Sequence, residues 1–92
     1  MPDRLFDFVR ELLSGPAIKS RSPQDLLAEF GEVIRLARIE RNMNRKELAR
    51  RSGISERYVA VLEQGRGNVT MVLLFRLVAA LQQSQQEPVS SN

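Results

Sequence analysis

Residues 44–66 read NRKELARRSGISERYVAVLEQGR, and this stretch predicts two short helices joined by a tight turn. Asn44 is a strong helix-start residue, because its side-chain oxygen can accept a bond from a backbone N–H at the beginning of a helix. Glu47 follows at the spacing of a capping box, so we expect its side chain to reach back to the Asn44 N–H. The first helix is expected to run to about Ser52, where Gly53 permits the left-handed conformation that often ends a helix.

The second helix of this stretch begins after another cap residue, Ser55, and is expected to run from Glu56 to about Gln64. Gly65 then ends it. The apolar positions are Leu48, Ala49, Ile54, Val59 and Leu62. They recur where both helices can close one corner of a core, while most other positions carry Arg, Lys or Glu. This pattern is typical of a helix-turn-helix that presents its second helix outward.

Two further helices are expected before this stretch. Residues 3–14 have apolar side chains at helical spacing, and residues 15–22 read as a linker that begins with Gly and Pro. Ser22 and Pro23 start a longer helix, expected to run to about Arg41, since a Ser cap followed by Pro is a common helix beginning. Two roles stay open for the 3–14 helix: packing on the core, or acting as an arm for dimerisation or a protein partner.

A last helix is expected over residues 71–82, capped by Thr70, and residues 83–92 read as a disordered tail because they are almost entirely polar. This helix is apolar nearly all round, and such a helix is usually buried on more than one side. We therefore expect a second cover for it, either the 3–14 helix or another subunit. Its expected core stripe is Met71, Leu74, Leu77, Val78 and Leu81, and the apolar residues outside the stripe are Val72, Leu73 and Phe75.

The composition excludes several classes of protein. Ninety-two residues form one small domain that is marginal alone, so dimerisation would help it. The sequence has no Cys and no His, which removes disulfides, thiolate metal sites and the commonest general base. We expect no metal, no cofactor and no enzymatic activity. No apolar run approaches the roughly 18 residues of a membrane span, and acidic residues interrupt the N-terminal apolar ones, so we expect a cytoplasmic protein.

The basic residues concentrate in the centre of the chain. The formal net charge is only +3, but between Arg35 and Arg66 nine Lys or Arg residues stand against four Glu. Most of them are Arg, whose planar group binds phosphate and guanine better than Lys does. This block indicates an anionic partner, most simply nucleic acid. The alternative is an ordinary solvated helical surface.

One family shares a specific set of these residues. They are Ile34-Arg35-Leu36-Ala37-Arg38, Glu47-Leu48-Ala49, Gly53-Ile54-Ser55, Val59, Leu62-Glu63, Gly65-Arg66, Leu74, Leu77, Ala79 and Leu81. With them, residues 30–81 resemble the Cro/C1-type (XRE-like) helix-turn-helix family of phage repressors and bacterial regulators. The resemblance implies an all-α, lambda-repressor-like helix-turn-helix bundle over residues 23–82, with an extra N-terminal helix and linker over 1–22. The family's usual fifth helix has no counterpart in the polar tail.

A closer likeness covers residues 53–70 and the Leu-rich helix after them. This part is similar to the DNA-binding half of aromatic-catabolism repressors, which bear a shikimate-kinase-like effector domain behind it. No such domain is present in these 92 residues. The likeness therefore implies either a fragment or a stand-alone relative.

The resemblance also implies which residues act. It places the 55–63 helix in the major groove of DNA, where Arg57 suits guanine, Glu56 suits cytosine and Val61 suits a thymine methyl group. The implied base-contacting residues are Ser55, Glu56, Arg57 and Val61. The implied DNA-backbone contacts are Asn44, Arg45, Lys46, Tyr58, Arg66 and Asn68. Arg38 and Glu63 are expected to form a partly buried pair. The alternative for each of these residues is an ordinary surface position.

The expected function is that of a sequence-specific transcriptional regulator that binds double-stranded DNA, and the resemblance implies a repressor. It is expected to bind a pseudo-palindromic operator as a homodimer, because a dimer presents two recognition helices one helical turn apart. Two alternatives stay open. One is an antitoxin or antiactivator that holds a protein partner with its apolar first and last helices, and the other is the DNA-binding half of a larger effector-sensing regulator.

Overall fold

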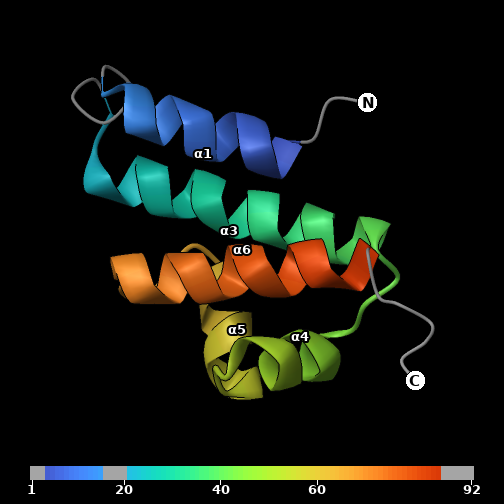
Figure 1. The fold of residues 1–92 in the computed structure, drawn as a ribbon. Coiled ribbons are helices and arrows are strands. Elements are labelled where there is room, and N and C mark those ends of the chain that lie inside the picture. Colours follow the sequence, from blue (N-terminus) through green and yellow to red (C-terminus); the bar gives the residue numbers. More distant parts are fainter. Residues whose placement is uncertain (1–3, 16–20, 86–92) are drawn as a thin grey trace.

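The computed structural model describes residues 4–15 and 21–85, and within them the chain forms helices and no strand (Figure 1). The helices are α1 (Arg4–Ser14), α3 (Pro23–Glu40), α4 (Arg45–Ser52), α5 (Glu56–Glu63) and α6 (Met71–Gln85). The expected all-α helix-turn-helix bundle with an extra N-terminal helix is confirmed. Most of the expected linker, 16–20, and most of the expected tail, 86–92, lie outside the described residues, as do residues 1–3.

Helix α3 is the centre of the bundle. It packs against α1, α5 and α6, while α4 packs against α5 and α6. In Figure 1, α1, α3 and α6 run one below another, and α4 and α5 lie beneath α6. The rings of Phe8 in α1 and Phe30 in α3 are in contact, with their centroids 5.9 Å apart. Leu5 and Phe8 are both buried, so α1 has the first of its two expected roles, packing on the core.

The expected cap residues begin the helices as the sequence predicts. In each case the side chain accepts a hydrogen bond from the backbone N–H three residues further on. The bonds join Ser22 to Asp25 (3.1 Å), Asn44 to Glu47 (2.7 Å), Ser55 to Tyr58 (3.0 Å) and Thr70 to Leu73 (3.1 Å). Asn42 and Gly53 follow α3 and α4 with φ of 54° and 75°, and this left-handed backbone turns the chain sharply between α3, α4 and α5.

The Glu47 side chain does not complete the expected capping box. The Glu47 carboxylate accepts hydrogen bonds from Arg50 and Arg51, one turn further along α4, in place of the Asn44 N–H. Two cations on the same helix face attract a carboxylate more strongly than one neutral amide does.

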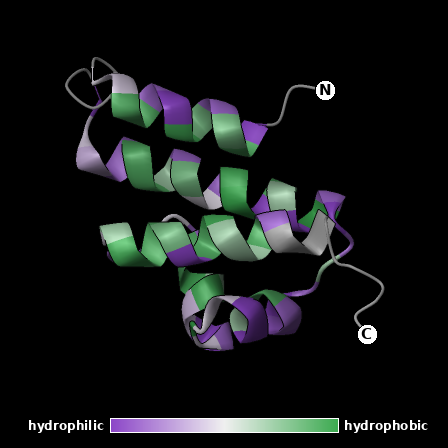
Figure 2. Ribbon diagram, viewed as in Figure 1, coloured by the Kyte–Doolittle hydropathy of each residue, from purple (hydrophilic) through white to green (hydrophobic). Residues whose placement is uncertain are grey.

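Helix α6 differs from its prediction in length and in its core face. It continues to Gln85, three residues past the expected end, because residues 83–85 contain no Gly or Pro to stop it. Met71 was expected in the core but is 56% exposed, whereas Ala80 is buried. Val72 and Phe75 are 58% and 60% exposed, so α1 does not supply the second cover that the sequence predicts for α6. Figure 2 shows how apolar the first half of this helix is.

Candidate nucleic-acid interface

Helix α5 is fixed to the bundle by its inner face. Val59 and Leu62 are each 1% exposed and lie in the core. Gly31 of α3 lets the two helices approach closely, since a Cβ atom at Gly31 would lie 2.3 Å from the Leu62 carbonyl oxygen and 3.0 Å from that of Glu63. No side chain fits in that space. The position of α5 therefore depends on a residue that the sequence analysis did not single out.

The outer face of α5 begins with three of the four implied base-contacting residues. Ser55, Glu56 and Arg57 are exposed, and Ser55 also caps the helix. Val61 is half-buried, and its Cγ1 atom would lie 3.2 Å from a Cβ atom at Gly67. The N-terminal turn of α5 thus presents a hydroxyl, a carboxylate and a guanidinium to solvent, which are groups that can read base edges. Val61 lies deeper, beside the loop that follows the helix.

Glu63, at the end of α5, holds two arginines. Its Oε2 atom accepts from Nε of Arg38 at 2.6 Å, and its Oε1 atom accepts from Nη2 of Arg38 at 3.1 Å. The expected pair is therefore present and bidentate. Its Oε1 atom also lies 3.0 Å from Nε of Arg45. The side chains of Glu63, Arg38 and Arg45 are 1%, 11% and 44% exposed. A buried carboxylate needs such partners, because an uncompensated charge in the interior costs several kcal/mol.

This cluster joins the start of α4 to the end of α5. Arg45 was implied as a phosphate contact, and the structure gives it an additional contact with Glu63 that the sequence analysis did not predict. A guanidinium has five N–H donors, so the exposed part of Arg45 keeps donors for a phosphate. Asn44 and Lys46 are exposed beside it. The first turn of α4 therefore combines cationic side chains with a helix N-terminus, and both attract anions.

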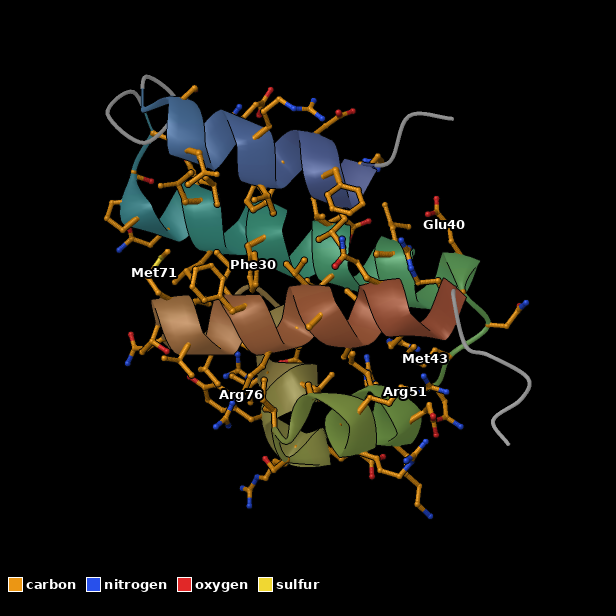
Figure 3. All side chains as sticks on the ribbon, viewed as in Figure 1. Phe30, Glu40, Met43, Arg51, Met71 and Arg76 are labelled. Atoms are coloured by element: carbon orange, nitrogen blue, oxygen red, sulfur yellow. The ribbon has the colours of Figure 1, made fainter. Side chains whose placement is uncertain are left out.

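The charges further along α4 are paired with one another. Arg50 and then Arg51 donate hydrogen bonds to Glu47 and lower the pKa of that carboxyl below its ordinary value. Figure 3 shows Arg51 on α4, below α6. These two arginines add less positive field toward a partner than their number suggests, because the Glu47 charge partly cancels theirs.

The loop after α5 is tied back to that helix by Tyr58. The Tyr58 hydroxyl donates to the Asn68 carbonyl oxygen at 2.8 Å and accepts from the Asn68 N–H at 2.7 Å. A tyrosine hydroxyl has a single proton to donate. A phosphate contact by this hydroxyl therefore requires that it give up its bond to the Asn68 carbonyl oxygen. Asn68 and Arg66 are exposed on the same loop, and Arg66 contacts the Gln64 side chain at 2.6 Å.

Two arginines have positions that the sequence did not indicate. Arg41 belongs to the central basic block, yet its side chain is 3% exposed and its Nε donates to the Leu81 carbonyl at 2.9 Å. It joins the end of α3 to α6 and is not available to a large partner. Arg76 is exposed on the side of α6 that faces α4 and α5 (Figure 3), and its Nη1 would lie 3.8 Å from a Cβ atom at Gly53.

Among residues 4–15 and 21–85, no group of three or more His, Cys, Asp or Glu residues is arranged to hold a metal ion. Within the same described part of the chain, no helix is both long and apolar enough to cross a membrane.

The arrangement defines a class of protein. A helix anchored by one face, with an exposed polar N-terminal turn and a cationic helix start beside it, is the DNA-reading unit of helix-turn-helix proteins. The model of a family described as helix-turn-helix matches residues 34–84, more than half of the chain. The chain belongs to this XRE-type helix-turn-helix family.

Two relatives agree with this assignment. The chain is 40% identical over 66 residues to the uncharacterized HTH-type transcriptional regulator y4dJ of Sinorhizobium fredii, covering 72% of this chain and 86% of the relative. It is 34% identical over 58 residues to a hypothetical transcription factor of Neisseria meningitidis serogroup B, covering 63% of this chain and 55% of that relative. No solved structure matches. The family and both relatives support a DNA-binding transcription regulator.

Proposed function

We propose that this protein is a sequence-specific transcriptional repressor that binds a pseudo-palindromic operator as a homodimer. The observation that supports this most is the orientation of α5, whose inner face is buried while Ser55, Glu56 and Arg57 are exposed. In the proposed complex these three residues, together with Val61, contact base edges in the major groove. We propose the cytoplasm, at the nucleoid, as the place of action.

The backbone contacts complete this proposal. Asn44, Arg45 and Lys46 at the start of α4 bind phosphates on one side of α5, and Arg66 and Asn68 bind them on the other. The Glu63 cluster joins the first group to α5, and Tyr58 joins the second. Both sets of phosphate contacts are thereby fixed relative to the base-reading turn, which sets the register of the protein on DNA.

A titration against salt tests the DNA-binding part of the proposal. The affinity for a labelled random-sequence duplex is measured by fluorescence anisotropy at several salt concentrations. The logarithm of the binding constant should fall linearly with the logarithm of salt concentration, by a slope of about −0.9 for each neutralised phosphate. The Lys46→Ala variant should lose about one such unit of slope.

Arg10 offers a matched control. It is a well-exposed arginine paired with Asp7 at 2.9 Å, and its helix, α1, is separated from α4 and α5 by α3 and α6 (Figure 1). The Arg10→Ala variant should keep the wild-type slope. A wild-type affinity that does not change with salt, or equal effects of Arg10→Ala and Lys46→Ala, would contradict the proposed surface.

A second candidate function is binding to a protein partner, as an antitoxin or antiactivator does. The exposed apolar residues Met71, Val72 and Phe75 on α6 favour it, because apolar patches on small proteins commonly mark interaction sites. The purified chain decides between the candidates. A stable homodimer formed by the chain alone supports the repressor, whereas a chain that is stable only with a co-encoded protein supports the second candidate.

A further inference from the structure

The exposed side of α6 carries a stripe without charge. Met71, Phe75 and Ala79 follow one another at intervals of four residues and share a helix face, with Val72 beside them. Met71, Val72 and Phe75 are 56–60% exposed, and Ala79 is exposed as well. We call these four residues the α6 stripe. Interface centres are depleted of charge and enriched in aromatic residues and Met, as this stripe is.

An apolar pocket of about 350 Å³ adjoins the stripe. Its walls come from α1, the start of α3, the loop before α6, and α6 itself. They include Phe8, Leu12, Leu26, Leu27, Phe30 and Leu74. Met71 belongs to both the stripe and the pocket wall, and lies at the first turn of α6 (Figure 3). A hollow and a projecting aromatic side chain, Phe75, therefore lie side by side on one surface.

The chemistry of the pocket favours apolar side chains over a polar ligand. Ligand pockets usually contain a few polar groups that converge on the ligand and orient it. Here the backbone N–H and carbonyl of Asn68 are used by Tyr58, and the Thr70 hydroxyl accepts from the Leu73 N–H, so the polar groups left are the Asn68 carboxamide and the Thr70 hydroxyl proton, both on the 67–70 loop. Every other lining residue is Pro, Gly or carries an apolar side chain.

We propose that the α6 stripe and this pocket form the interface between two copies of the chain, with Phe75 of each copy entering the pocket of the other. A two-fold interface uses the same patch on both copies, so that patch must contain both a projecting side chain and a pocket that receives it. A buried aromatic side chain removes about 150–250 Å² from water, and stable dimers bury about 800 Å² on each partner. In this proposal the rest of the contact comes from the stripe itself and from the pocket rim at Leu12, Val69 and Thr70.

This inference rests on the proposed function, because it names the surface of the proposed homodimer. None of the base-reading residues Ser55, Glu56 and Arg57 belongs to the stripe or the pocket. Dimerisation through α6 therefore leaves both recognition helices exposed. Asn68, a proposed phosphate contact, stands at the edge of the pocket and also binds Tyr58 of α5, so the proposed interface borders the DNA-contacting loop.

Sedimentation equilibrium of the full chain across a range of concentrations tests the interface. The wild type should be a dimer, and Phe75→Glu should weaken dimerisation by at least about 100-fold, since it moves a charge into an apolar pocket. Leu13→Glu is the matched control, because Leu13 is an even more exposed apolar residue, at 75%, on α1 outside the stripe. It should dimerise like the wild type. Val72→Glu is a second variant within the stripe and should also weaken the dimer.

Circular dichroism separates loss of dimer from loss of fold, and Phe75→Glu should keep a helical spectrum because its side chain is already mostly exposed. A wild type that stays monomeric, a dimer broken by Leu13→Glu and not by Phe75→Glu, or a need for a co-encoded partner would overturn the proposed interface. DNA binding is scored separately. A Phe75→Glu monomer that still binds a duplex leaves the proposed function standing, whereas a wild-type dimer that binds no DNA refutes that function and supports the interface.

Discussion

The Glu63 cluster makes a quantitative prediction about stability. Glu63→Gln keeps the shape of the side chain but removes its charge, so Arg38 loses its ionic partner in a site where its side chain is 11% exposed. Removing one partner of a buried pair costs about 3–5 kcal/mol. We expect the lower end, about 3 kcal/mol, because Arg38 keeps its bond to the Met43 carbonyl at 2.9 Å and the exposed part of Arg45 can turn to water.

A loss of this size is easily measured in a chain of 92 residues. Domains of this length lose about 4–8 °C of Tm for each kcal/mol, so Glu63→Gln should lower the Tm by about 12–24 °C in a thermal melt followed by circular dichroism. Glu32→Gln is the control, because Glu32 forms a similar bidentate contact with Arg35 on the surface, where both side chains are more than a third exposed. Its melt should match the wild type. Equal melts of the wild type and Glu63→Gln would show that the Glu63 charge does not stabilise the fold.

Tyr58→Phe should destabilise the protein by about 1 kcal/mol and speed hydrogen exchange at the Asn68 amide, measured by NMR, whereas an unchanged Asn68 exchange rate would show that the hydroxyl does not hold the loop. Gly31→Ala should cost about 3 kcal/mol or more in urea unfolding, because its Cβ overlaps a backbone carbonyl that cannot move aside; a neutral substitution would disprove this close approach. Hydrogen bonds from Arg50 and Arg51 lower the pKa of the Glu47 carboxyl. Its contribution to the free energy of unfolding is therefore full above the ordinary pKa of 4.5 and is lost as pH falls through the lower pKa of the folded state. The difference in stability between wild type and Glu47→Gln should therefore shrink between pH 7 and acid, and a constant difference would count against that assignment.

The helix-turn-helix could be predicted because its signals are local. Cap residues such as Asn44 and Ser55 act on a backbone N–H three residues away, and Gly53 sets the turn by its own conformation. The period of apolar side chains then identified the inner face of α5. Each of these effects acts over one or two helical turns, so the sequence alone contains the information.

The remaining features depend on distances that the sequence does not contain. Arg45 and Glu63 are 18 residues apart, and their contact exists only because α4 and α5 fold against each other. The burial of Arg41 depends likewise on the end of α6, forty residues away. Gly31 was within reach of sequence reasoning, since a glycine inside a helical pattern often marks close packing.

The exposure of α6 shows the limit of periodicity. The pattern predicted a helix apolar nearly all round and a second cover, and it could not say whether α1 or another subunit supplies that cover. The structure excludes α1 as that cover, because α1 packs on α3 and leaves Met71 and Phe75 exposed.

In the proposed complex the N-terminal turn of α5 reads a DNA sequence, and selection of bound sites from random duplexes measures that reading. The wild type should enrich a pseudo-palindrome whose half-sites are centred about 10 base pairs apart. Arg57→Ala should lose the preference at the base pair that Arg57 contacts, at a cost of about 1–3 kcal/mol, while still binding duplex DNA without preference. No enrichment by the wild type, or the same motif from Arg57→Ala, would show that this turn does not read the sequence.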